Sequence, residues 1–189
     1  MNSSLKSIAE VRMGFHIRGS VQEELGGNAI LLQIRDVDDE GQFDEKSLTV
    51  IEVPNLENHS LRPGDVVFLA RGVRMHAFLF EGSQSDAIVP ASYFMVLRVK
   101  HNLVDPRYLV WAINQDAFQS QFDTASTKST VPQITKAALI ELKVELPDLA
   151  IQRRIVEVDR LMKIEWKLTQ QLQNRRTVLL NAVSRGFER

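Results

Sequence analysis

The sequence predicts an α+β fold: a β-rich domain, built as a bent sheet or partial barrel with short helices, followed by one long C-terminal coiled-coil helix. Short apolar runs separated by turn residues recur through the first 100 residues, which is typical of strands. Helical spacing of apolar residues begins near Asp105, and from Asp148 to Phe187 no proline occurs and no glycine before Gly186. We therefore expect two parts, residues 1–147 and residues 148–189.

The predicted strands are short runs of β-branched and apolar residues. They are Ile8–Met13, Ile30–Ile34, Leu48–Val53, Val66–Ala70, Ala77–Phe80 and Tyr93–Val99. The strongest turn signal between them is Pro63-Gly64. Proline presets φ at the second position of a type II turn, and glycine accepts the positive φ that the third position requires. Regular short strands with such turns favour a barrel or a strongly bent sheet.

Beyond the strands, Asp105 is the expected N-cap of a helix with Pro106 at its first position. Residues 119–130 are polar and lack periodicity, which predicts a loop. Residues 134–146 are expected to hold a short helix and then a strand that ends at Pro147.

The last segment has the pattern of a coiled-coil seam. With Val158 at heptad position a, the a and d positions are Val158, Leu161, Glu165, Leu168, Leu172, Arg175, Leu179 and Ala182. In an antiparallel pair that crosses at Gln170, Glu165 faces Arg175, whereas a parallel pair stacks like charges on one another. The seam therefore favours an antiparallel two-fold homodimer.

An alternative is that this apolar stripe packs on the chain's own β-rich domain, because such stripes usually face a core. Both arrangements can hold along one helix. In that case Ile151, Ile155 and Trp166 serve the domain while the distal seam serves the dimer.

Composition excludes several classes of protein. The 189 residues are 44% hydrophobic and 25% charged, which is ordinary for a globular protein. Cysteine is absent, which excludes disulfides, thiolate metal sites and a cysteine nucleophile. No apolar run reaches the ~20 residues of a membrane span and the start is no signal peptide, so we expect a cytoplasmic protein without membrane contact.

The chain also lacks the patterns of common catalytic sites. Its four histidines have no metal-ligand spacing, and neither a nucleophile elbow nor a phosphate-binding loop occurs. We expect no metal, no cofactor and no catalysis, which leaves a binding protein.

Charge is distributed unevenly along the chain. Residues 1–60 carry a balance of −6, residues 61–150 a balance of 0 and residues 151–189 a balance of +5, although the net charge is only −1. Such asymmetry indicates a charged partner, or an acidic head that packs on a basic tail.

Three stretches offer the side chains that contact nucleic acid. The first surrounds Gly72 with Arg71, Arg74 and His76; the second contains Lys128 and Ser129; the third contains Arg18, between His16 and Gln22. Arginine, lysine and small hydroxyl side chains presented from loops bind phosphates and base edges. Each stretch is equally interpretable as a solvated turn.

Five ordered stretches resemble one known family. The stretch 146–156 (LPDLAIQRRIV) resembles the "L-P-x-L-x-x-Q-x-x-I-V" junction that closes a target-recognition domain in the specificity subunit of Type I restriction–modification enzymes. The others that resemble this family in order and spacing are 8–14, 61–68, 94–109 and 131–134. Together they extend over nearly the whole chain.

The resemblance implies a β-rich DNA-reading domain and a long helix that acts as a spacer. It also implies that the subunit itself is non-catalytic. The expected partners are double-stranded DNA and DNA methyltransferase (modification) subunits that bring S-adenosylmethionine, with or without a restriction subunit that brings ATP-driven cleavage.

The chain departs from the family pattern in two ways. A full specificity subunit carries two recognition domains and two helices, whereas one of each is found here, and the glycine common near Thr127 and Lys128 is missing. Dimerisation through the helix would supply the second half and predicts a palindromic split site. The alternatives are a non-catalytic protein-interaction or scaffold module, and an inactive fragment of a specificity subunit.

Overall fold

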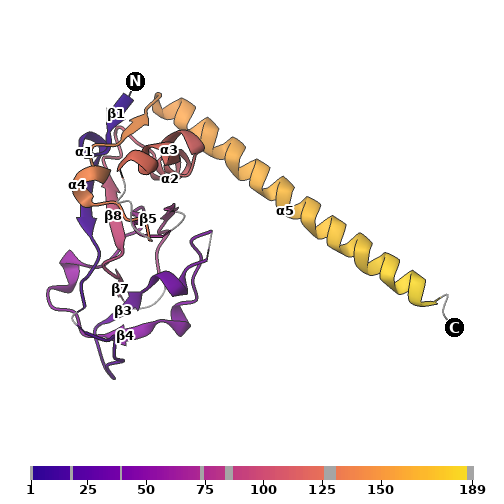
Figure 1. Cartoon of the computed structure of the whole chain (residues 1–189), viewed down its shortest axis with the longest axis horizontal. Coiled ribbons are helices and arrows are strands. Elements are labelled where there is room, and N and C mark those ends of the chain that lie inside the picture. The colour runs from indigo at the N-terminus through magenta and orange to yellow at the C-terminus, as the bar shows by residue number, and fades with distance from the viewer. Residues whose placement is uncertain are drawn as a thin grey trace.

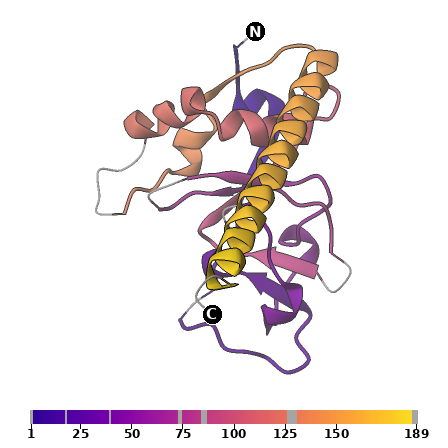
Figure 2. The same ribbon diagram turned by 90° about the vertical axis from the view of Figure 1, so that its right-hand side faces the viewer.

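The computed structural model describes residues 2–17, 19–38, 40–72, 75–83, 87–125 and 131–186. A layered α+β domain is followed by one long helix that leaves it as a straight rod (Figure 1). Figure 2 shows the same layers after a quarter turn, with the long helix crossing in front of them. The predicted fold class is confirmed, and the described residues form open sheets without a closed barrel.

The central layer is a four-stranded antiparallel sheet. Its strands in spatial order are β2 (Ala9–Met13), β8 (Phe94–Val99), β5 (Val66–Leu69) and β6 (Ala77–Leu79). A mixed three-stranded sheet lies beneath it, in the order β4 (Thr49–Ile51), β3 (Ala29–Leu32) and β7 (Ala87–Pro90). A two-stranded ribbon pairs β1 (Asn2–Ser4) with β9 (Lys143–Glu145).

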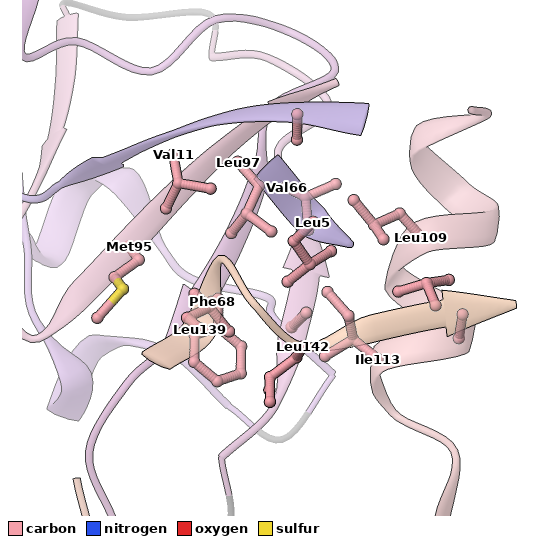
Figure 3. Packing of buried hydrophobic residues seen from close by; sticks show 14 of the residues in the cluster. Leu5, Val11, Val66, Phe68, Met95, Leu97, Leu109, Ile113, Leu139 and Leu142 are labelled. Atoms are coloured by element: carbon pink, nitrogen blue, oxygen red, sulfur yellow. The ribbon is translucent and has the colours of Figure 1, made fainter. Parts of the chain in front are cut away.

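Side chains of β5 alternate between two hydrophobic cores. Val66 and Phe68 belong to a core shared with the helices, whereas Val67 and Leu69 belong to a core shared with β3 and β7. Strand β8 alternates in the same way. Figure 3 shows the first core, where side chains from the sheet meet Leu109 and other residues of the covering helices. Both faces of the central sheet are therefore buried, which explains why these strands are apolar runs without polar alternation.

Short helices cover the upper face of the sheet. They are α1 (Leu5–Ile8), α2 (Pro106–Ile113), α3 (Asp116–Ala125) and α4 (Lys136–Leu139). The 3-10 turns η1 (Ile34–Asp36) and η2 (Glu45–Ser47) lie between β3 and β4 of the lower sheet, and η3 (Leu56–Asn58) lies between β4 and β5. The predicted cap of α2 is confirmed, because the Asp105 carboxylate accepts a hydrogen bond from the Arg107 amide.

The predicted loop at 119–130 is wrong for its first part, which is helix α3. Phe118 and Phe122, one helical turn apart, are buried and hold this polar segment against Phe68. Residues 126–130 lie outside the described residues. Strands β1 and β7 were not predicted, and the predicted strand at Ile30–Ile34 ends two residues early because Ile34 starts η1.

The long helix α5 (Leu149–Gly186) has 38 residues, close to the predicted bounds. Its first turn is capped by Asp148, whose carboxylate accepts a hydrogen bond from the Ile151 amide at 2.9 Å. Ile155 and Val156 pack against the domain core. Every apolar side chain of α5 from Val158 to Val183 is exposed, so the helix depends on the domain only at its beginning.

A partly buried ion pair joins the 62–65 turn to β8. The turn has the predicted form, with the Asp65 amide donating to the Arg62 carbonyl and Gly64 at φ +91°. Asp65 is 1% exposed, and its carboxylate accepts bonds of 2.8 and 2.7 Å from Arg98 and one of 2.9 Å from the Arg62 amide. These side-chain hydrogen bonds raise the pKa of Arg98. The pair therefore fixes the turn to the sheet.

We predict that Asp65→Ala lowers the free energy of unfolding by about 3 kcal/mol, because the Arg98 charge and the Arg62 amide lose their partner. The matched control is Glu141→Ala, which removes the exposed ion pair with Lys6 and is expected to cost less than about 1 kcal/mol. Urea denaturation measures both. Equal losses in the two variants would contradict the assigned role of Asp65.

Candidate nucleic-acid interface

The start of the first predicted contact stretch forms a paired edge with residues 132–134. The Ile134 amide donates to the Ala70 carbonyl, and the Gly72 amide donates to the Pro132 carbonyl, each at 3.0 Å. Between these bonds Arg71 forms an antiparallel bridge with Gln133. Residues 70–72 and 132–134 thus lie side by side, although they are about 60 residues apart in the sequence.

Arg71 is the predicted contact residue whose side chain the structure places most clearly. Its guanidinium carbon lies 5.1 Å from the centroid of the Tyr93 ring, and Tyr93 is 43% exposed. A contact with a ring face is a cation–π interaction, and it leaves the N–H groups at the guanidinium edge for other acceptors. The stack therefore holds a charged, donor-rich group at the protein surface.

Tyr93 belongs to this edge but was not predicted as part of the site. Its carbonyl accepts a hydrogen bond from the Ala70 amide, which ties the turn before β8 to the end of β5. In the sequence it is only the first residue of an apolar strand. Its solvent exposure depends on the turn at 91–93, which no local pattern reveals.

His76 lies at the base of the β5–β6 hairpin. It is half-buried, and its carbonyl accepts a hydrogen bond from the Leu69 amide at 2.9 Å. The predicted contacts Arg18, Arg74, Lys128 and Ser129 lie outside the described residues. Their roles stay predictions, as does that of His76.

The seam residues of α5 are exposed in the single chain. Val158, Leu161, Leu168, Leu172 and Leu179 are 51–65% exposed. The alternative that this stripe packs on the chain's own domain is wrong, and Trp166, at 65% exposed, does not serve the domain either. Ile155 does, as expected. An exposed apolar stripe of this length is typical of an interaction surface.

In the described part of the chain we find neither a cluster of metal ligands nor a helix suited to cross a membrane. No group of three or more histidine and carboxylate side chains there is placed to hold a metal ion. None of its helices combines the length and the apolar character needed to cross a bilayer.

Comparison with known proteins decides the family. A sequence model described as the Type I restriction modification DNA specificity domain matches residues 1–175, which include the domain, the paired edge and most of α5. The chain belongs to this family.

Known family members share the fold at low sequence identity. The specificity subunit of the Type I restriction enzyme HindI from Haemophilus influenzae is 24% identical over 111 residues, which are 58% of this chain and 24% of that protein. Two crystal structures match with a TM-score of 0.62 for the HsdS subunit from Thermoanaerobacter tengcongensis and 0.59 for the Type I S subunit from M. genitalium.

The two structures are 20% and 11% identical to this chain, cover 86% of it and are themselves covered to 37% and 38%. The chain thus spans about a quarter to two fifths of the length of these relatives. Both structures support the fold of a Type I specificity subunit.

We predict that Gly72→Ala separates the two segments of the paired edge. Gly72 has φ +132°, a conformation that costs an alanine about 1–3 kcal/mol, although its Cβ would meet no neighbour. Hydrogen exchange measured by mass spectrometry is expected to show lost protection at 70–72 and 131–134. Gly19→Ala, with φ +87° and equally open space, is the control. Unchanged protection at 131–134 in Gly72→Ala would contradict this interpretation of the edge.

Proposed function

We propose that this chain is a DNA-recognition subunit of a Type I restriction–modification complex and that each chain reads one half-site of a split sequence. The family match from the β-rich domain into the long helix carries this proposal. The arrangement of the chain supports it, since a compact domain presents Arg71 at a paired edge while α5 extends away with an unpartnered apolar stripe.

In this proposal the paired edge enters the major groove. Arg71 reads a guanine through two hydrogen bonds to O6 and N7, a contact that discriminates against the wrong base by about 1–3 kcal/mol. Arg18, Arg74, His76, Lys128 and Ser129 supply further contacts to bases or phosphates. The Tyr93 stack restricts the Arg71 side chain before DNA arrives, which lowers the entropy lost on binding.

The second half-site is read by a second copy of the chain. Two α5 helices that cross antiparallel at Gln170 bring Leu168 against Leu172 and Glu165 against Arg175, and the two-fold axis makes the split site palindromic. Half-sites about one helical turn apart, ~34–36 Å, suit a two-fold reader.

Chemistry in such a complex belongs to other chains. Modification subunits would carry S-adenosylmethionine and methylate adenine, and a restriction subunit, where present, would drive cleavage with ATP. The chain described here would act without its own cofactor, in the cytoplasm where the DNA of the host lies.

We predict that Arg71→Ala changes which duplexes the protein selects from a randomised double-stranded DNA library. Loss of the guanine contact should relax the preference at one position of each half-site and weaken binding of the selected sequence about five- to a hundredfold. Lys46→Ala removes an equal charge from η2, beside the other sheet, and should leave the selected sequence unchanged.

Two results of this selection would count against the proposal. Equal effects of Arg71→Ala and Lys46→Ala would mean that Arg71 contributes only positive charge and reads no base. A wild-type chain that selects no sequence, alone and with Type I modification subunits, would favour the scaffold or the inactive fragment.

We predict that Glu165→Arg converts a dimer into a monomer in multi-angle light scattering, because the introduced guanidinium would face the partner's Arg175 at two symmetry-related places. Arg175→Glu should act alike, and the double variant Glu165→Arg/Arg175→Glu should restore the dimer. In a parallel pair, residue 165 of one helix faces residue 165 of the other, and residue 175 faces residue 175. Like charges therefore meet in the wild type and in every variant, so no rescue is expected for that arrangement. A wild-type chain that stays monomeric at all concentrations would refute the seam.

A further inference from the structure

The direction of α5 is set within its first two turns. Ile155 and Val156 pack on the domain core, and farther along the helix up to Val183 each apolar side chain is exposed. Figure 1 shows the consequence, a rod attached at one end only. Whatever fixes these two turns fixes the whole helix.

The most restrained side chain in this short anchor is Gln152. It is 0% exposed, and among the described residues only Gln152 and Asp65 are buried charged or amide side chains. Gln152 Oε1 accepts a hydrogen bond from the Asp105 amide at 2.9 Å. Its Nε2 donates to the carbonyls of Leu103 at 3.1 Å and Pro147 at 2.8 Å.

These three partners belong to two different segments. Leu103 and Asp105 form the turn that leads into α2, and Pro147 ends the segment that leads into α5. One planar amide therefore ties the start of α5 to the start of α2 through two bonds, and a third bond holds it to the segment that leads into α5. Apolar contacts such as those of Ile155 are non-directional and tolerate tilting, whereas hydrogen bonds weaken when their angles change.

A small tilt at this anchor has a large effect at the helix crossing. At 1.5 Å per residue, Gln170 lies about 27 Å beyond Gln152, so a tilt of about 10° displaces it by roughly 5 Å. Duplex DNA rises about 3.4 Å per base pair. Without a restrained anchor, the distance between two recognition domains would therefore vary by more than the rise of one base pair.

We propose that Gln152 is a positioning residue that holds α5 at a fixed angle to the DNA-reading domain and thereby sets the spacing between half-sites. The spacing part of this inference rests on the proposed function, and the angle does not. Gln152 touches no DNA in this proposal; it acts through the helix.

The angle is tested by distances between two spin labels in the same chain. The absence of native cysteine allows labels at Glu57→Cys on η3 and Lys167→Cys on α5, with excess unlabelled chain added so that only distances within one chain are read. Gln152→Met keeps the length of the side chain and removes all three bonds. We expect its distance distribution to shift or to broaden by several ångström relative to the wild type.

Gln121→Met is the matched control. Gln121 also bonds a backbone amide and carbonyl, both of Lys143, at 3.1 and 3.0 Å, but it does so away from α5. Its loss should leave the distances unchanged. Gln152→Asn, which keeps a shorter amide, takes the place of Gln152→Met if the latter does not fold by circular dichroism. Wild-type distances in a folded Gln152 variant would overturn the proposal.

The spacing is tested with duplexes that carry two selected half-sites and a spacer of varied length. We expect the wild type to bind duplexes with one spacer length most tightly. In Gln152→Met, the ratio between the affinities for this spacer and for the next longer one should fall at least threefold. The affinity of Gln152→Met for a single half-site should equal that of the wild type. A purely structural role would weaken binding to all duplexes alike and would contradict the inference. A wild type without any sequence preference would refute the proposed function, and the label distances would still decide the role of Gln152.

Discussion

Burial of the central sheet on both faces is the constraint on which the rest of the structure depends. Because β5 and β8 send alternate side chains into two cores, the sheet must be covered by helices above and by the three-stranded sheet below. Because these strands are buried on both faces, polar side chains can be placed only at the strand ends, where the backbone emerges from between the layers. The edge at Arg71 and Gln133 is such a place, so the same packing that forms the core also presents the candidate interface.

Much of the fold could be predicted from local sequence patterns. The Pro63-Gly64 turn, the Asp105 cap and the uninterrupted helix from Asp148 each depend on a few neighbouring residues, and the structure contains all three. Helix α3 could not be predicted in this way. Its polar composition hides Phe118 and Phe122, which pack on each other, and Phe122 packs on Phe68, about 50 residues earlier in the chain.

The candidate site was predictable only in part for the same reason. Arg71 stands out by charge beside a glycine, but the pairing of its segment with Pro132 and Gln133 is a long-range contact. Tyr93 carries no signal because its exposure results from a turn between two buried strands. Gln152 stands in the junction motif at 146–156, but the motif does not say what the residue does; its three backbone partners are visible only in the structure.

Because the net charge of the chain is small, DNA binding by the proposed dimer would depend strongly on how its two domains are placed relative to each other. Non-specific affinity for DNA grows with the number of phosphates that a protein neutralises, and a chain with a net charge of −1 and a balance of −6 in its first 60 residues neutralises few. A single domain would therefore bind DNA weakly. Two domains on a rigid connection gain affinity because binding of the first raises the effective concentration of the second at its half-site. That gain is largest when the span of the connector matches the separation of the half-sites, and it is lost when the geometry prevents both domains from binding at once. In the proposed dimer of a chain with this charge, a stiff joint at the start of α5 would thus contribute to affinity as well as to the choice of spacer.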